Sequence, residues 1–385
     1  MLVRFKGANL LLLILCVMSL SARCNNSTQS SLDSIREEYA VPALGGLIQQ
    51  DNSIAVFVSG VRKHDNATSV ESSDKFHLGS NTKAMTSTLI AILVQSGEIQ
   101  WETKLSDVFK EWSSTMDPKL KTVTLEMLGA HMSGITPDLL GFQNGILLKI
   151  AMDSRKSVPK IREETSRLIL EAIPQTEPGS HFEYSNMNYI ILGTVLEKIT
   201  GLSWEQLIVS KIFQPLGMES CGFGPPGDVK APNPDQPWAH QRTPSGIQSM
   251  PPDSNADNPP ALGPAGTVHC SMGDWAKFLK IHRDGFNGLS SPILAAEGFK
   301  KLHQPYPGQE YTPGGWLRLE RPWAEGPVLT HDGSNNGNFS TAWIAPKKNM
   351  VLLSVANIGG ADEATDKVIQ LLISDKSKLA SRQPN

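Results

Sequence analysis

The sequence contains few cysteines and no excess of either charge. Only 4 of its 385 residues are cysteines, which excludes a disulfide-rich miniprotein. The 35 Lys and Arg residues against 38 Asp and Glu residues give a net charge of −3, so no basic surface for nucleic acid is expected. Beyond the N-terminus no apolar run approaches the roughly 20 residues of a membrane span, and we expect a soluble mature protein. The apolar content of 39% and the length predict a globular chain of two or three domains.

The first residues have the pattern of a secretory signal peptide. Arg4 and Lys6 precede an apolar run over residues 10–20, and small residues follow as far as Ala22. Such a run is too short for an ordinary transmembrane helix, which leaves a buried N-terminal helix as the structural alternative. We therefore expect residues 1–22 to be removed and the protein to be exported, to a periplasm or to the extracellular space.

The cysteines leave two questions open. Cys24 follows the expected cleavage site, but Arg23 before it is too large for a lipoprotein signal, which disfavours lipid anchoring. Removal of the leader also removes Cys16. In an oxidising compartment Cys221 and Cys270 can form a disulfide, and two buried free thiols are the alternative.

Strand-like stretches occur at both ends of the chain, with helix-like stretches between them. Strands are expected at 44–48, 54–59, 328–331, 339–345 and 350–356, and helices at 32–39, 82–96, 124–128, 161–172, 187–200, 204–213, 272–283 and 362–375. This order predicts an α/β (α+β) fold in which an antiparallel sheet, built from both termini and flanked by helices, carries an inserted all-helical domain. The sheet domain is assigned to 31–78 and 312–376, the helical domain to 79–311 with a Pro-rich surface excursion at 225–264, and a tail to 377–385.

Two common hydrolase signatures are missing, and a third pattern is present. The sequence has no Gly-x-Ser-x-Gly elbow and no His-Glu-x-x-His, which disfavours an α/β-hydrolase and a zinc hydrolase. Ser-x-x-Lys occurs three times, at Ser72–Lys75, Ser157–Lys160 and Ser80–Lys83. On a helix this spacing lets the amine accept the proton of the hydroxyl. Ser72–Lys75 lies in a polar turn, and Ser157–Lys160 contains Pro159, which disfavours helical geometry at the residue before it. Ser80 instead lies at the N-terminus of the apolar helix expected at 82–96, where developing negative charge is favoured. The context therefore favours Ser80.

Three motifs in order, and one further segment between the first two, resemble one enzyme superfamily. The similarity is to the serine β-lactamases and penicillin-binding proteins. It lies in Gly79-Ser80-Asn81-Thr82-Lys83 with the helix after it, the segment 128–135 (LGAHMSGI), Tyr184-Ser185-Asn186 and His331-Asp332-Gly333. The chain is identified as a member of the class C-like branch, which also holds family VIII esterases, D-aminopeptidases and D-Ala-D-Ala carboxypeptidases. The resemblance covers almost the whole chain after residue 22.

The resemblance implies a role for each matched residue. Ser80 would attack a carbonyl carbon to form an acyl-enzyme, and Lys83 would be its general base if burial lowers the pKa of its amine. Tyr184 would be the second proton-transfer group, and Asn186 would hydrogen-bond the substrate. The backbone N–H groups of Ser80 and Ser334 would form the oxyanion hole. No cofactor and no metal are implied.

The third motif suggests the kind of substrate. His331 and Gly333 would line the strand along which a substrate lies, and Asp332 stands where β-lactam-cleaving members have a small or hydroxyl residue. A carboxylate about 4 Å from a substrate carboxylate costs roughly 4 kcal/mol at an effective dielectric of about 20, unless Asp332 points away or pairs with a cation, which the sequence does not show. We therefore expect ester or amide hydrolysis of a neutral or amine-bearing small molecule or peptide. β-Lactamase or D-Ala-D-Ala carboxypeptidase activity, and a non-catalytic penicillin-binding or sensor protein, are the alternatives.

Overall fold

The computed structural model describes residues 27–51, 53–137, 145, 149–150, 153, 155–253, 256–335 and 337–379, with side chains as far as residue 374. The expected leader at 1–22 and Cys24 lie outside the described residues, as do the last residues of the expected tail. Within the described chain, no helix is long and apolar enough to cross a membrane.

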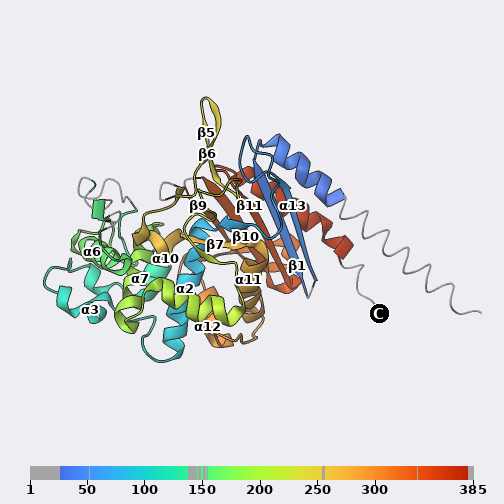
Figure 1. Cartoon of the computed structure of the whole chain (residues 1–385). Coiled ribbons are helices and arrows are strands. Elements are labelled where there is room, and N and C mark those ends of the chain that lie inside the picture. The colour runs from blue at the N-terminus through green and yellow to red at the C-terminus, as the bar shows by residue number, and fades with distance from the viewer. Residues whose placement is uncertain are drawn as a thin grey trace, which may run out of the picture.

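The sheet is antiparallel and combines strands from both ends of the chain, as predicted. Its six strands have the order β2-β1-β11-β10-β9-β8 (Figure 1). They are β1 (Ala43–Gln50), β2 (Ser53–Gly60), β8 (Leu317–Arg321), β9 (Gly326–Asn335), β10 (Asn338–Ala345) and β11 (Met350–Ala356). β8 was not predicted. Its residues are only partly buried and it forms one edge of the sheet, so its apolar signal is weak.

Helices cover both faces of this sheet. Leu44 and Leu352 belong to the core under α13 (Asp362–Leu379), and the helix at 27–38 packs on the same face through Leu32. Leu47 and Leu353 belong to the core on the opposite face, where α11 (Met272–Phe286) packs against β1 and β11. Since successive side chains on a strand point to opposite faces, odd-numbered residues of β11 face one core and even-numbered residues the other. The sheet is therefore buried on both faces.

The middle of the chain is mostly helical. Its longer helices are α2 (Thr82–Gln95), α6 (Val158–Glu171), α7 (Asn186–Thr200), α11 and α12 (Ala296–His303). The shorter helical segments are η1 (Gly79–Asn81), α3 (Leu105–Val108), η2 (Lys110–Trp112), η3 (Leu120–Thr122), α4 (Leu125–Gly129), α8 (Trp204–Ile208), η5 (Val209–Phe213), α9 (Gln214–Leu216), η7 (Pro260–Leu262) and α10 (Gly263–Gly266). Two more short helices, η8 (Pro322–Ala324) and η9 (Pro346–Lys348), lie between strands of the sheet. α2 is buried over nearly its whole length, as its apolar pattern predicts, and ends before Gly97, whose φ is +79°.

Short strands also occur where only helices and loops were expected. A three-stranded sheet has the order β3-β7-β4, formed by β3 (Lys75–His77), β7 (Val268–Ser271) and β4 (Gly222–Phe223). The structure joins Cys221 and Cys270 in a disulfide beside it. A two-residue strand has too short a pattern to be recognised without its partners. The division into two interleaved domains stays a prediction.

The Pro-rich stretch at 225–264 is only partly a surface excursion. It carries a hairpin of β5 (Ala239–Thr243) and β6 (Gly246–Met250), which projects from the molecule in Figure 1. Its C-terminal end is buried instead, and Ala261 and Pro264 lie in the core. The chain enters this core because α10 packs against α2 and α7. The expectation of a surface loop is wrong for this end, which delivers Ala265 to the site described below.

Candidate active site

Ser80 and Lys83 lie one helical turn apart at the point where η1 continues into α2. The Lys83 side-chain nitrogen is 3.0 Å from Ser80 Oγ. Ser80 is half-buried and lies at the N-terminal end of this helical segment. Gly79 directly before it has a φ of +50°, a backbone conformation that favours glycine. The turn thus presents the hydroxyl and the amine to each other.

Lys83 is completely buried and is held by oxygen atoms from three parts of the chain. Besides Ser80, its ammonium group donates to Asn186 Oδ1 at 2.7 Å and to the Ala265 carbonyl oxygen at 2.8 Å. Burial lowers the pKa of this amine well below its ordinary value, because charge is costly away from water. A buried amine with a lowered pKa loses its proton more readily than an exposed one and can then accept a proton from an adjacent hydroxyl.

Tyr184 completes a compact group around the serine. It lies two residues before α7 begins, and its hydroxyl forms a hydrogen bond with the side chain of Ser80. Its ring centroid is 4.9 Å from the Lys83 nitrogen and 4.3 Å from the His131 ring centroid. Burial raises the pKa of Tyr184 above its ordinary value, which keeps the phenol protonated at neutral pH. The motifs around 80, 184 and 186 therefore converge in space.

The end of β9 packs directly on the nucleophile turn. A Cβ atom built on Gly79 would lie 2.6 Å from the backbone nitrogen of Ser334, and one built on Gly333 would lie 2.0 Å from the Leu78 carbonyl oxygen. Both glycines are therefore required for this close approach. The contact brings Gly333 and the Ser334 backbone to Ser80. The third motif thus joins the first two.

His331 lies on the same face of β9 and is buried. Its Nε2 atom is 3.0 Å from the Tyr311 hydroxyl oxygen, and its ring centroid is 6.1 Å from that of Tyr184. Burial, with a smaller contribution from the charge of Lys83, lowers the pKa of His331 to about 3. The imidazole is therefore neutral at neutral pH.

Asp332 does not join this cluster. Successive side chains of β9 alternate, so Asp332 points to the opposite sheet face from His331. There its carboxylate hydrogen-bonds Thr341, and burial together with Asp366 and Asp362 of α13 raises its pKa. The expected contact between Asp332 and a substrate is wrong, because the strand turns this side chain toward α13. The predicted repulsion between Asp332 and a substrate carboxylate is therefore no longer expected.

One known protein family matches most of the chain. Residues 29–374 match the family described as Beta-lactamase. The chain belongs to the β-lactamase family. Both the family and the fold are those of serine hydrolases.

The chain is similar to members of the β-lactamase family that have different names. It is 25% identical over 350 residues to penicillin-binding protein 4 of Amycolatopsis lactamdurans, covering 86% of this chain and 85% of that protein. The structure is similar to a D-alanine carboxypeptidase of Burkholderia cenocepacia, with a TM-score of 0.72, 18% identity and coverage of 92% and 99%. It is also similar to a D-amino acid amidase of Ochrobactrum anthropi, with a TM-score of 0.70, 20% identity and coverage of 92% and 99%. These structural likenesses show the β-lactamase/transpeptidase fold.

A buried chain of tyrosines behind the β-lactamase-family site was not found from the sequence. Tyr311 bonds His331 and also Tyr189, whose hydroxyl donates to the Gly129 carbonyl oxygen at 3.1 Å and lies 3.2 Å from Ser87 Oγ. Only the Tyr189 position lies near a matched motif. Tyr311 stands in no recognisable pattern, since His331 is 20 residues away in the sequence.

A second buried network reaches the nucleophile turn from the other side. His77 Nδ1 accepts a hydrogen bond from the backbone nitrogen of Gly79 at 3.0 Å, and its Nε2 lies 2.8 Å from Asp257 Oδ1. Since Nδ1 is an acceptor, Nε2 carries the hydrogen and donates to the carboxylate. The separation of 180 residues between His77 and Asp257 explains why no sequence motif shows the pair.

The other two Ser-x-x-Lys pairs have no such surroundings. Ser72 lies exposed in a turn before β3, which begins at Lys75. Ser157 is the residue before α6, and Lys160 forms an ion pair with Glu163 on the surface. Among the described residues, no group of three or more His, Cys, Asp or Glu side chains could hold a metal ion. Ser80 is thus the serine of these three that stands beside a buried lysine.

Proposed function

We propose that this member of the β-lactamase family cleaves an ester or amide bond through an acyl-enzyme on Ser80. The observation that carries the proposal is the 3.0 Å contact between Ser80 Oγ and the buried nitrogen of Lys83, whose pKa is lowered. A serine hydroxyl is a weak nucleophile at its ordinary pKa and needs an adjacent base. Lys83 supplies that base once it has lost its proton.

The proposed reaction has two halves. In the first, Lys83 takes the proton of Ser80 while Oγ bonds to the substrate carbonyl carbon, and the resulting oxyanion is held by the backbone N–H groups of Ser80 and Ser334. The bond to the leaving group then breaks, and Tyr184 passes the proton to the departing alkoxide or amine. In the second, a water molecule gives up a proton to the same groups, attacks the acyl carbon and releases the acid with Ser80 restored. Asn186, beside Lys83, hydrogen-bonds the substrate.

The substrate side of the site supports a neutral or amine-bearing substrate. Residues 331–335 at the end of β9 include no Lys or Arg, and His331 is neutral because of its lowered pKa. A substrate carboxylate at this strand therefore meets no fixed positive charge from β9. The preference for such a substrate thus rests on the lack of positive charge at the end of β9 and not on Asp332, which faces α13. It favours an esterase or amidase over an enzyme that selects carboxylate-bearing β-lactams or D-Ala-D-Ala peptides.

We also propose that the protein is exported. The pattern of residues 1–22 supports this, and so does the disulfide between Cys221 and Cys270, which would persist in an oxidising compartment. Mass spectrometry of the protein secreted from its host would test the proposal. A mature chain that begins near residue 23 is expected, and a cytoplasmic chain that keeps its leader would contradict it.

A substrate panel tests the proposed activity. The mature protein should hydrolyse p-nitrophenyl butyrate and D-amino-acid p-nitroanilides with a higher kcat/KM than nitrocefin or a D-Ala-D-Ala peptide. Equal values on nitrocefin and p-nitrophenyl butyrate would contradict the esterase or amidase preference. Stoichiometric labelling of Ser80 by penicillin with no turnover on any substrate would indicate a binding or sensor protein instead.

A further inference from the structure

His131 holds the backbone on both sides of Tyr184. The backbone N–H of Glu183 donates to the His131 carbonyl oxygen at 2.9 Å, and the N–H of Ser185 donates to His131 Nδ1 at 3.1 Å. Tyr184 lies between these two donors in the sequence. One residue, which follows α4 more than 50 positions earlier, therefore fixes the chain before and after the tyrosine.

The backbone of His131 has an uncommon conformation that makes this double contact possible. Its φ is +59°, in the left-handed region that residues other than glycine rarely adopt. Such conformations persist where the surrounding structure holds them, and they concentrate at functional sites. The His131 side chain is completely buried, and its ring centroid lies 4.3 Å from that of Tyr184 and 4.9 Å from that of Tyr311. His131 thus presents a carbonyl oxygen and a ring nitrogen to one short segment.

The hydrogen bonds of His131 show which ring nitrogen carries its hydrogen. Asn188 Oδ1 accepts from Ser133 Oγ at 2.6 Å, so Asn188 Nδ2 donates to His131 Nδ1 at 3.2 Å. Nδ1 accepts this bond and the Ser185 N–H, and it therefore carries no hydrogen. Burial lowers the pKa of His131 well below its ordinary value, so the ring is neutral with its hydrogen on Nε2. Nε2 has no hydrogen-bond partner among the described residues, which leaves Nδ1 as the ring atom that holds the segment.

The segment held by His131 brings two side chains to the nucleophile. The Tyr184 hydroxyl forms a hydrogen bond with the side chain of Ser80. Two residues later, Asn186 Oδ1 accepts a hydrogen bond from the Lys83 nitrogen at 2.7 Å. A displacement of a reacting group by about 1 Å can lower a rate about 10²-fold. The position of this segment therefore bears directly on proton transfer.

We propose that His131 is a positioning residue, which holds the Tyr184 hydroxyl where it can protonate the leaving group. The proposal rests on the proposed function. There the proton that Lys83 takes from Ser80 reaches the leaving-group oxygen or nitrogen through Tyr184 as its bond to the carbonyl carbon breaks. His131 should then matter most for a leaving group that needs this proton. An alkoxide needs it, whereas p-nitrophenolate is a stable anion that can depart without one.

Two esters test this role, because both give the same butyryl-enzyme on Ser80. Ethyl butyrate releases an alkoxide and p-nitrophenyl butyrate releases p-nitrophenolate, so their kcat/KM values compare the acylation step. His131→Leu removes the acceptor and should lower kcat/KM about 10²-fold on ethyl butyrate but only about threefold on p-nitrophenyl butyrate. Tyr184→Phe should show the same selective loss. Equal losses on the two esters in His131→Leu, beside a selective loss in Tyr184→Phe, would indicate a merely structural role and overturn the proposal.

His131→Asn is the matched variant for the acceptor atom. Asn branches as Leu does, tolerates a positive φ and can place an oxygen near the position of Nδ1. It should restore kcat/KM on ethyl butyrate to within about tenfold of the wild type. A loss as large as that of His131→Leu would overturn the proposal. If His131→Leu does not fold, His131→Gly removes the same acceptor and is relaxed at this φ, and the same two outcomes apply to it.

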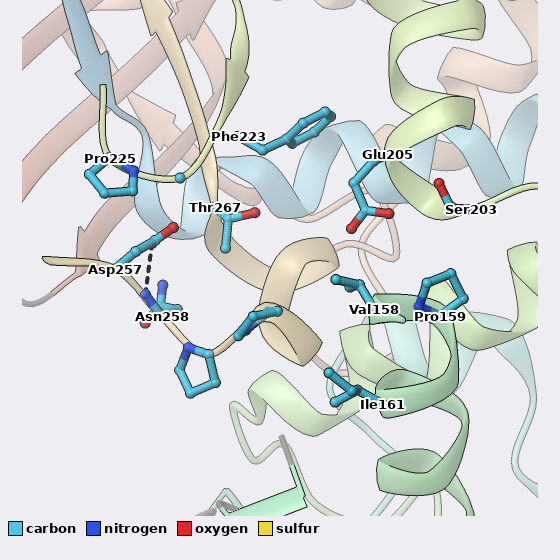
Figure 2. Close-up of a pocket in the computed structure, with 13 residues that line it drawn as sticks. Val158, Pro159, Ile161, Ser203, Glu205, Phe223, Pro225, Asp257, Asn258 and Thr267 are labelled. Atoms are coloured by element: carbon cyan, nitrogen blue, oxygen red, sulfur yellow. Dashed lines mark hydrogen bonds between the residues drawn. The ribbon is translucent and has the colours of Figure 1, made fainter. Parts of the chain in front are cut away.

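A control for general loss of stability lies in a separate pocket. Phe223 borders the pocket between α6, α8 and β4, which Ser80 and Tyr184 do not line, and its ring centroid lies 5.3 Å from that of Trp204 (Figure 2). Phe223→Leu should lower the melting temperature but leave the ratio of the two kcat/KM values unchanged. A wild type that hydrolyses neither ester would overturn the proposed function and this proposal with it, whereas equal losses in His131→Leu would overturn the role of His131 alone.

Discussion

The side-chain nitrogen of Lys83 lies 3.0 Å from Ser80 Oγ although the lysine side chain is completely buried. An exposed lysine keeps its proton until about pH 10.4 and would be a poor base at neutral pH. Burial lowers the pKa of Lys83 well below that value, which is the condition that the proposed role of Lys83 as a base requires. The environment of one side chain thus determines whether its neighbour can act as a nucleophile.

The first prediction concerns the pH dependence of the reaction. Protonation of Lys83 removes the base, so kcat/KM should fall as the pH drops through the lowered pKa and should reach its plateau far below pH 10. Lys83→Arg keeps a cation that cannot give up its proton, and kcat should fall by about 10²- to 10⁴-fold at every pH. A pH–rate profile of both proteins on p-nitrophenyl butyrate checks this. Near-normal turnover by Lys83→Arg would show that Lys83 is not the base.

The second prediction concerns His77, which we assign as a positioning residue. His77→Ala removes the acceptor for the Gly79 N–H and should lower kcat about tenfold, equivalent to about 1.4 kcal/mol, with little change in KM. His77→Asn can place an oxygen near the position of Nδ1 and should restore part of the loss. Steady-state kinetics with circular dichroism as a folding control would test it. Equal losses in Ala and Asn would indicate that the acceptor atom is not what matters.

The third prediction tests the close contact between β9 and the nucleophile turn. A Cβ atom on Gly333 would lie 2.0 Å from the Leu78 carbonyl oxygen, so Gly333→Ala should lower the free energy of unfolding by about 1–3 kcal/mol and reduce kcat. Gly273→Ala is the matched control, since no atom beyond its chain neighbours and the backbone of its own helix, α11, lies within 4 Å of its Cβ position. That variant should be as stable as the wild type or slightly more so. Chemical denaturation of both compares them directly, and equal stability would contradict the required contact.

The fourth prediction concerns stability in acid. His282 Nδ1 lies 2.9 Å from His303 Nε2 in the core, and burial lowers the pKa of His282 to about 3 and that of His303 well below its usual value. Both are neutral when folded but take up protons when unfolded below pH 6.5. The unfolded state therefore binds more protons between about pH 6.5 and 3, and stability falls as the pH falls.

One substitution can separate the contribution of His282 and His303 to the pH dependence of stability from that of other titratable groups. His303→Gln should reduce the slope of unfolding free energy against pH by about 1.4 kcal/mol per pH unit in that range, the effect of one proton. Urea denaturation at pH 6.5, 5.5 and 4.5 measures the slopes. An unchanged slope in the variant would contradict the assignment of a neutral buried pair.

Local sequence patterns were sufficient to predict those helices, strands and site residues whose contacts are local. The apolar periodicity of α2 and the three-residue spacing of Ser80 and Lys83 were sufficient to choose this pair among three, and the sheet from both termini followed from strand positions. Alternation along β9 implies that His331 and Asp332 point to opposite faces of the sheet. The sequence does not show which of the two faces the site, because that depends on the register of the strand.

Contacts between distant segments could not be predicted in this way. Ala265 reaches Lys83 across 182 residues through a backbone carbonyl, which every residue has and no motif marks. Asp257 meets His77 across a similar separation. The strands β3, β4 and β7 are too short to show a pattern, and they exist because they pair with one another and are tied by Cys221–Cys270. These features depend on the assembled core.

The most direct test of the central claim is the initial rate of p-nitrophenyl butyrate hydrolysis by Ser80→Ala beside Ser72→Ala. Both changes remove one serine hydroxyl from a Ser-x-x-Lys pattern, but only Ser80 lies beside a buried lysine. Ser80→Ala should lose at least about 10³-fold in kcat with an unchanged melting temperature, because no acyl-enzyme can form, while Ser72→Ala should match the wild type. Wild-type turnover by Ser80→Ala would contradict the account.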